Sequence, residues 1–149
     1  MQGRIKEHAG LTRPMSSKDA ALIQAYFRCF NAGDQAGMLA CLADDVSHDV
    51  NEGGRRRGLA LFANFLQHMD RCYKEQLKDI VVMAGDVPGR VAAEYIVHGT
   101  YLATDEGLPP ARGQTYVLPA GSFFEVSNGK ISRVTTYYNL QNWIKQVSA

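Results

Sequence analysis

The sequence has few of the features that mark secreted, membrane or nucleic-acid-binding proteins. Its three cysteines, Cys29, Cys41 and Cys72, are an odd number without a CxxC pair, which argues against a disulfide or zinc framework and favours the reducing cytoplasm. Residues 1–16 contain no long apolar run, so we expect neither a signal peptide nor a membrane span there. The formal net charge is only +1, which excludes strong attraction to nucleic acid or an anionic membrane. The expected partner is a small apolar molecule.

The length of the chain, 149 residues, suits one domain that buries roughly 70% of its unfolded surface. We expect a flexible leader over residues 1–16, where charges, glycines and a proline are mixed. A single domain is then expected over residues 17–149.

The spacing of apolar residues predicts helices at residues 18–31 and about 59–73, each with one apolar face. Gly33 ends the first, and Asp34 can cap a short second helix. Alternating patterns predict strands, and Ser127-Asn128-Gly129 indicates a hairpin between the last two. The predicted strands span residues 46–51, 77–83, 90–104, about 114–126 and 131–139, followed by a helical turn at 142–147. Helices followed by a four-strand antiparallel meander indicate an α+β fold with a curved sheet wrapped on the helices.

The strand predicted at residues 90–104 is the most informative stretch. Its alternation divides the side chains between two faces. One face is apolar, with Val91, Ala93, Tyr95 and Val97, and the other carries Glu94, Ile96 and His98. An ionisable group on a central strand needs a partner or a cavity, so we interpret the second face as the floor of a pocket. The apolar face would then lie outside and need a cover.

Four short stretches stand out as motifs, namely Gln24-Ala25-Tyr26, Phe30-Asn31-Ala32-Gly33-Asp34, Leu42-Ala43-Asp44-Asp45-Val46 and Asn128-Gly129-Lys130-Ile131. Together they resemble the NTF2-like superfamily, and within it the ketosteroid isomerase-related and SnoaL-like polyketide cyclase branch. The resemblance covers residues 17–147. It implies a cone-shaped α+β barrel with a deep pocket, and a homodimer formed through the outer face of the sheet.

The resemblance also allows a test of ketosteroid isomerase chemistry, which needs a carboxylate base and an oxyanion hole made by a tyrosine and a protonated acid. Tyr26 matches the tyrosine. The base position falls on Val50 and the acid position on Gly121, so two of the three groups are missing. Asp49 would replace the base only if a bulge shifted the strand by one residue. We therefore do not expect steroid isomerisation.

The pattern of the family points further side chains into the pocket. The proposed catalytic residues are His48, Glu94, His98 and Tyr26, because a histidine beside a carboxylate in an apolar cavity suits general acid/base work. The same groups would also be explained by a hydrogen-bonded core network without function. The expected ligand-binding residues are Val50, Asn51, Ile96, Val134, Thr136 and Tyr138.

Two hypotheses for function follow. The first is a cofactor-free enzyme that moves a proton on an apolar, oxygen-bearing substrate, as an isomerase, cyclase, dehydratase or hydrolase does, with Tyr26 donating to the substrate oxygen. The second is a non-catalytic ligand-binding or dimerisation module.

Three other features have simpler readings. A metal triad of His48, Glu94 and His98 lacks a local ligand pair, so no metal is expected. The run Arg55-Arg56-Arg57 either meets an anionic substrate tail or is a solvated loop. Residues 105–113 form either a lid or a plain connection.

Overall fold

The computed structural model describes residues 17–51 and 53–149. The predicted leader, residues 1–16, lies outside the described residues, as does Glu52 of the basic loop. Within them the elements follow in the order α1 (Ser17–Ala32), α2 (Gln35–Ala40), β1 (Leu42–Asp49), β2 (Arg55–Arg57), α3 (Leu59–Cys72), β3 (Tyr73–Ala84), β4 (Arg90–Tyr101), β5 (Thr115–Ser127), β6 (Lys130–Tyr138) and α4 (Leu140–Val147).

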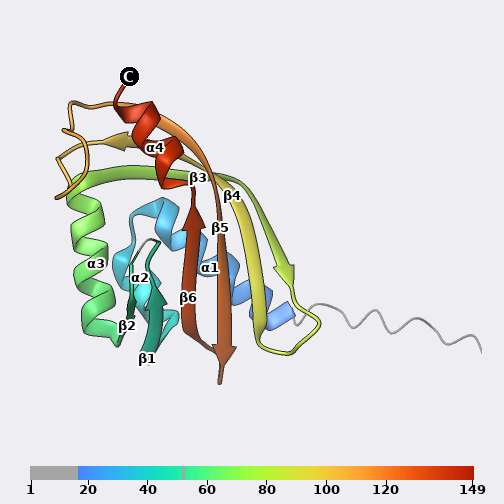
Figure 1. The fold of residues 1–149 in the computed structure, drawn as a ribbon. Helices are drawn as coiled ribbons and strands as arrows, with labels where there is room; N and C mark the ends of the chain where they lie inside the picture. Colours follow the sequence, from blue (N-terminus) through green and yellow to red (C-terminus); the bar gives the residue numbers. More distant parts are fainter. Residues whose placement is uncertain (1–16, 52) are drawn as a thin grey trace, which may run out of the picture.

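The six strands form one curved sheet in the order β2-β1-β6-β5-β4-β3 (Figure 1). The α+β class and the wrapping of the sheet around helices are confirmed. The expected four-strand antiparallel meander is confirmed as β3, β4, β5 and β6, and β1 extends the sheet by pairing parallel to β6. The run Arg55-Arg56-Arg57 is also not a loop, since it forms the short edge strand β2 against β1.

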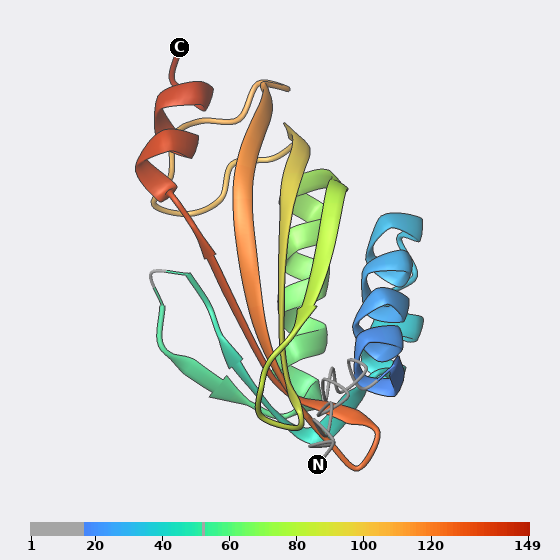
Figure 2. The ribbon, with the colours of Figure 1, turned by 90° about the vertical axis from the view of Figure 1, so that its right-hand side faces the viewer.

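Helices α1 and α3 cover the concave face of the sheet, as the turned view shows (Figure 2). Each contributes apolar side chains at helical spacing, with Ile23 and Phe27 from α1 and Phe62 and Leu66 from α3 fully buried. The ring of Phe27 meets that of Tyr95 on β4 edge to face, with 5.3 Å between centroids. The core therefore lies between these helices and the concave face.

The facing predicted for β4 is wrong. Val91, Ala93, Tyr95 and Val97 are at most 7% exposed and point into the core. The physical reason is that the phenylalanine-rich faces of α1 and α3 need an apolar sheet surface to pack against, and this is the most apolar face that the chain offers. The homodimer cannot use these four residues, because the helices already cover them.

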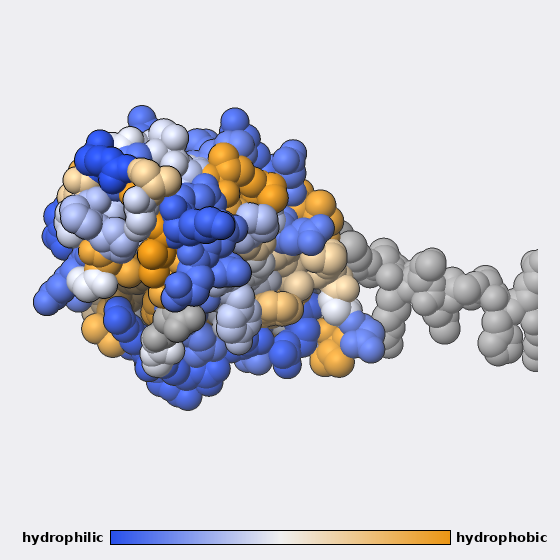
Figure 3. All heavy atoms as spheres, turned by 45° about the horizontal axis from the view of Figure 1, so that its top comes forward, coloured by the Kyte–Doolittle hydropathy of each residue, from blue (hydrophilic) through white to orange (hydrophobic). Residues whose placement is uncertain are grey.

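The wide end of the molecule is formed by α4 and by the connection between β4 and β5 (Figures 1 and 2). Trp143 of α4 is buried against Tyr101 and Tyr116, with ring centroids 5.0 and 5.9 Å away. Viewed with this end forward, the surface is mostly polar with separate apolar strips (Figure 3). No helix in the described part of the chain has the length and apolar character needed to span a bilayer.

Candidate functional site

A cavity of about 350 Å³ opens between the helices and the edge strand β3. Its lining combines apolar side chains with three charged residues, Asp70, Lys74 and Glu75. Asp70 and Lys74 are exposed, whereas Glu75 is partly buried on the side of β3 that faces the core. Other lining residues are Phe30 and Asn31 at the end of α1, Met38 of α2, Leu66 and Met69 of α3, Tyr73 of β3, and Leu102. A largely apolar cavity with one partly buried carboxylate suits binding of a small molecule and chemistry on it.

The carboxylate of Glu75 is held by a tyrosine from two strands away. Tyr116 of β5 donates a hydrogen bond from its hydroxyl to Oε2 of Glu75 at 2.7 Å. Gly99 lies on β4 between them, paired with both residues. A Cβ at position 99 would overlap the Tyr116 ring, so the glycine is what lets the tyrosine cross β4 and reach the carboxylate.

Burial controls the ionisation of this pair. It raises the pKa of Glu75 above its usual value, and the hydrogen bond from Tyr116 partly offsets the rise. Burial also raises the pKa of Tyr116, and the nearby Glu75 charge raises it further. Tyr116 therefore stays a neutral donor, while Glu75 becomes a stronger base than an exposed glutamate and also a group that can carry a proton.

Aromatic rings surround the pair. Tyr73 stacks on Tyr101 with 5.4 Å between centroids, and Trp143 meets Tyr73 edge to face at 6.0 Å. These rings come from β3, β4 and α4. They shield the carboxylate from water, and of the three rings Tyr73 lines the cavity.

A second polar group, a series of hydrogen-bonded hydroxyls, lies on the concave face nearer to α1. The hydroxyls of Tyr95 and Ser122 lie 2.7 Å apart, and those of Ser122 and Thr136 lie 2.9 Å apart. Tyr26 is buried beside Phe27 and Phe124. Burial and the neighbouring Tyr95 raise the pKa of Tyr26, so this predicted hydrogen-bond donor keeps its proton.

The predicted site residues of β4 are not part of this interior. Glu94 is exposed, and Ile96 and His98 are half-buried on the convex face. Their cross-strand partners on β5 are Gly121, Pro119 and Val117. The convergence of Glu94 and His98 with Tyr26 and His48 is therefore wrong, since the sheet separates the two groups. For the same reason the structure does not form the metal triad considered from the sequence.

His48 does face the core, from β1. Its ring lies 4.5 Å from the rings of Phe62 and Phe65. Burial lowers its pKa to about 4, and Arg56 acts in the same direction. Its Nδ1 is buried without a hydrogen-bond partner in the described part of the chain. His48 is therefore neutral at pH 7 and is a weaker base than an exposed histidine.

The other predicted ligand-binding residues lie on β6 or just after β1, and Val134 is paired directly with His48. Val134 is buried and Thr136 is half-buried on the concave side, whereas Tyr138 is 36% exposed. Val50 and Asn51 follow β1 and are half-buried. The Asn51 side chain accepts a hydrogen bond from the Tyr138 backbone N–H at 3.2 Å, so it joins the ends of the two strands.

Asp49, the alternative base, has a structural partner. It faces the convex side, where Arg55 donates to both its oxygens at 2.7 and 3.1 Å and Thr135 donates at 2.6 Å. These bonds lower its pKa to about 2. A carboxylate held in this way is a poor base, and its role is to fasten β2 to the sheet.

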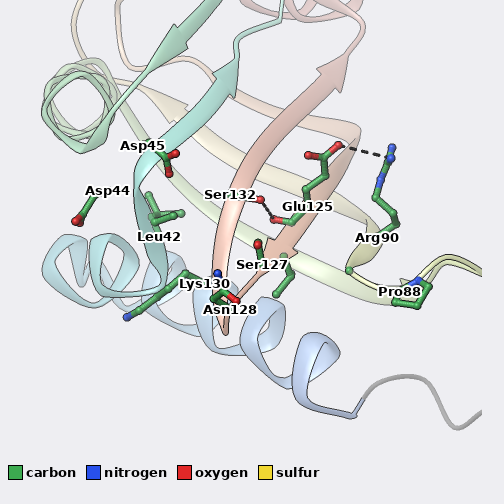
Figure 4. Close-up of a pocket in the computed structure, with 13 residues that line it drawn as sticks. Leu42, Asp44, Asp45, Pro88, Arg90, Glu125, Ser127, Asn128, Lys130 and Ser132 are labelled. Atoms are coloured by element: carbon green, nitrogen blue, oxygen red, sulfur yellow. Dashed lines mark hydrogen bonds and ion pairs between the residues drawn. The ribbon is translucent and has the colours of Figure 1, made fainter.

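A larger groove, of about 680 Å³, lies at the narrow end of the molecule beside the β5–β6 hairpin (Figure 4). Three of its charged groups have partners within the chain. Arg90 lies 3.6 Å from Glu125, and Lys130 donates to the Ala40 carbonyl at 2.6 Å. The smaller cavity is the better candidate site, because it holds a partly buried carboxylate that a buried tyrosine positions.

Sequence reasoning missed Glu75 and Tyr116. The pattern predicted a helix to residue 73 and a strand from residue 77, which left Glu75 in a connection. In the structure β3 begins directly after α3. The signal was present, because Tyr73, Glu75 and Leu77 alternate onto one face if the strand is extended backwards.

Comparison with known proteins agrees with the resemblance. The chain matches the SnoaL-like domain family over residues 23–134. No curated protein matches it. A candidate polyketide cyclase of Silicibacter sp. TM1040 is 61% identical, with a TM-score of 0.87 over 89% of this chain and 97% of the other. A candidate polyketide cyclase of Pseudomonas putida KT2440 is 57% identical, with a TM-score of 0.85 over 87% and 97%.

A more distant likeness concerns the fold alone. An LEH-like epoxide hydrolase of M. tuberculosis is 18% identical, with a TM-score of 0.67 over 91% of this chain and 92% of the other. The family match covers residues 23–134 of this chain. The matched region also covers 97% of each of the two candidate polyketide cyclases. The chain therefore belongs to the SnoaL-like domain family.

Proposed function

We propose that this protein is a small-molecule enzyme of the cyclase or isomerase type, in which Glu75 moves a proton on an apolar, oxygen-bearing substrate. The observation that carries the proposal is a partly buried carboxylate with a raised pKa in a largely apolar cavity, held by Tyr116 at 2.7 Å. Two relatives with 61% and 57% identity are described as candidate polyketide cyclases, which favours a substrate with several carbonyl groups.

The chemistry is an intramolecular carbon–carbon bond formation. Glu75, as the carboxylate, takes a proton through Oε1 from a carbon beside a carbonyl, while Oε2 accepts from Tyr116. The resulting enolate attacks a second carbonyl of the same molecule and closes a ring. The protonated Glu75 then returns its proton to the new alkoxide, so protons balance over the cycle. Tyr116 is a positioning residue, because it acts through the carboxylate.

The test compares two glutamates on opposite faces of the sheet. Purified protein is incubated with linear poly-β-keto ester probes, and ring closure is followed by chromatography and mass spectrometry. Glu75→Gln is expected to lose about 100-fold or more of the turnover. Glu94→Gln, the same change on the exposed convex face, is expected to match the wild type.

Two outcomes would count against the proposal. Equal turnover by Glu75→Gln and the wild type would remove Glu75 from the mechanism. Binding of the probes, seen as a thermal shift without turnover by any variant, would favour the non-catalytic binding module.

We also infer that a second copy of the chain covers the convex face of the sheet. Five large apolar side chains on β3, β5 and β6 are between 43 and 59% exposed there, namely Val81, Met83, Val117, Phe123 and Tyr137. Several large apolar side chains exposed on one face of a sheet are typical of a protein–protein interface. The homodimer expected from the sequence is thus proposed through this face.

A further inference from the structure

A second group of reactive side chains lies where α3 meets the β4–β5 connection. His68 and Cys72 are four residues apart in the last turns of α3, so they share one face of the helix. The connection is docked there by its backbone, since Leu102 and Ala103 both donate N–H bonds to the Cys72 carbonyl, at 2.8 and 3.3 Å. Asp105 is thereby brought to the same place.

Three possible ligand atoms converge at this point. The His68 Nε2, the Cys72 Sγ and a carboxylate oxygen of Asp105 all lie within 4.8 Å of one another. The His68 Nε2 and Asp105 Oδ1 are 2.9 Å apart. Cys72 is only 3% exposed, and the other two are partly buried. A small movement of these side chains would place all three around one cation.

The carboxylate is already oriented by its surroundings. Tyr73 donates its hydroxyl to Asp105 Oδ2 at 2.7 Å, and the Asp105 backbone N–H donates to the Tyr101 hydroxyl at 2.9 Å. These bonds turn Oδ1 towards His68. Groups that orient a ligand from behind are a regular feature of metal sites in proteins.

We propose that His68, Cys72 and Asp105 form a zinc-binding site that fastens the β4–β5 connection to α3. One imidazole nitrogen, one thiolate and one carboxylate are ligands that Zn²⁺ accepts together, and three protein ligands leave a fourth position for water. The four-residue spacing on α3 is a local ligand pair of the kind that the triad considered from the sequence lacked. The site departs from the expectation of a metal-free protein.

Arg71 stabilises the metal-free state against the metal-bound state, because it holds the His68 ring. Its Nη2 donates to His68 Nδ1 at 3.1 Å, which leaves the proton of a neutral His68 on Nε2, facing Asp105. Zinc needs the Nε2 lone pair, so that proton moves to Nδ1 and Arg71 releases the ring. The Cys72 thiol ionises at the same time. The balance is one proton released for each ion bound.

Cobalt(II) is a direct probe, because a thiolate ligand gives it an intense charge-transfer absorption. Full-length protein is stripped with a chelator and titrated with Co²⁺, then with Zn²⁺ in competition. The expected result is a thiolate–cobalt band at one equivalent, which zinc removes. Calorimetry of zinc binding in two buffers should report about one proton released. The absence of any such band would overturn the proposal.

Variants assign the band to these residues. Cys72→Ser is expected to abolish it, whereas Cys29→Ser and Cys41→Ser, which alter the other two free thiols, should leave it unchanged. Tyr73→Phe should weaken zinc binding by about 10-fold. Arg71→Gln should strengthen it, since it removes a positive charge and a competing hydrogen bond. Survival of the band in Cys72→Ser would refute the assignment.

Asp105→Asn provides a second test in case Cys72→Ser does not fold. It alters a partly exposed side chain, and loss of a ligand charge should weaken zinc binding by more than 10-fold. Zinc affinity equal to that of the wild type in this variant would also overturn the proposal.

Discussion

At the scale of single residues, the chemistry depends on how each ionisable group is buried. Glu75 and His48 both face the core, and burial moves their pKa values in opposite directions, because it disfavours the charged form in each case. The proposed base is therefore the Glu75 carboxylate, while His48 is kept neutral. From the sequence alone, a histidine beside a carboxylate was expected to do the acid/base work.

The first prediction concerns Tyr116. Its hydrogen bond lowers the pKa of Glu75 against the effect of burial, so Tyr116→Phe should raise that pKa further. Because the reaction needs the carboxylate, activity falls as pH drops below the Glu75 pKa. The acidic limb of the kcat/KM profile should therefore move to higher pH in Tyr116→Phe. A lower rate with an unmoved profile would contradict the positioning role.

The second prediction concerns His48 and acid stability. Its pKa of about 4 in the folded protein lies below the usual 6.5, so between these values the unfolded chain binds a proton that the folded chain does not. The free energy of unfolding should thus fall as pH drops from 6.5 to 4, by at most about 3 kcal/mol. Urea unfolding across this range should show the loss in the wild type.

His48→Phe is the control for this effect. The new ring fits the aromatic surroundings of Phe62 and Phe65 and cannot be protonated. The variant should therefore lose less stability between pH 6.5 and 4 than the wild type. An identical loss in both proteins would assign the pH dependence to other groups.

At the scale of elements, the site depends on neighbouring strands in register. Glu75, Gly99 and Tyr116 come from β3, β4 and β5, and they are cross-strand partners. A one-residue slip in either pairing would turn one of them to the other face. The hydrogen-bonded ladder, rather than the helices, is what brings the carboxylate and the tyrosine together.

The third prediction tests this register through Gly99. A Cβ at this position would overlap the Tyr116 ring, so Gly99→Ala should displace the tyrosine and lower the free energy of unfolding by about 1–3 kcal/mol. Activity at Glu75 should fall with it. Gly121→Ala is the matched control, because its Cβ would meet only the Ala93 carbonyl at an ordinary 3.5 Å.

Urea unfolding and turnover would be measured on both glycine variants. Equal stability of Gly99→Ala and Gly121→Ala would mean that Tyr116 can move away without cost. The close passage of the Tyr116 ring over Gly99 would then not be required for the site.

At the scale of the whole molecule, the two faces of the sheet have different roles. The concave face holds the core and the cavity, and the convex face exposes Phe123 and Tyr137 in an edge-to-face pair at 5.9 Å. Apolar area of this kind is stabilised when a partner covers it. The assembly is therefore expected to form on the side away from Glu75.

The fourth prediction is that Phe123→Asp converts a dimer into a monomer, since it buries a charge in the proposed interface. Leu61→Asp is the control, because Leu61 is similarly exposed, at 46%, but lies on α3. Sedimentation velocity at micromolar concentration should show a dimer for the wild type and the control. A wild-type monomer would refute the interface.

The sequence by itself determined the fold class, because helical periodicity in α1 and α3 and alternation in β4 and β5 depend only on local order along the chain. It also determined the family, through short motifs such as Asn31-Ala32-Gly33-Asp34. The positions of the helices and of most strands follow from the same patterns, apart from β2 and the early start of β3.

Only the tertiary structure decided which face of β4 is inside. Alternation divides residues into two sets, but the choice between the sets depends on what packs against them, and the helices select the more apolar one. The same choice moved Glu94 and His98 outside and brought Glu75 to Tyr116 across Gly99. Contacts between strands far apart in sequence are set by register and packing, which no local pattern records.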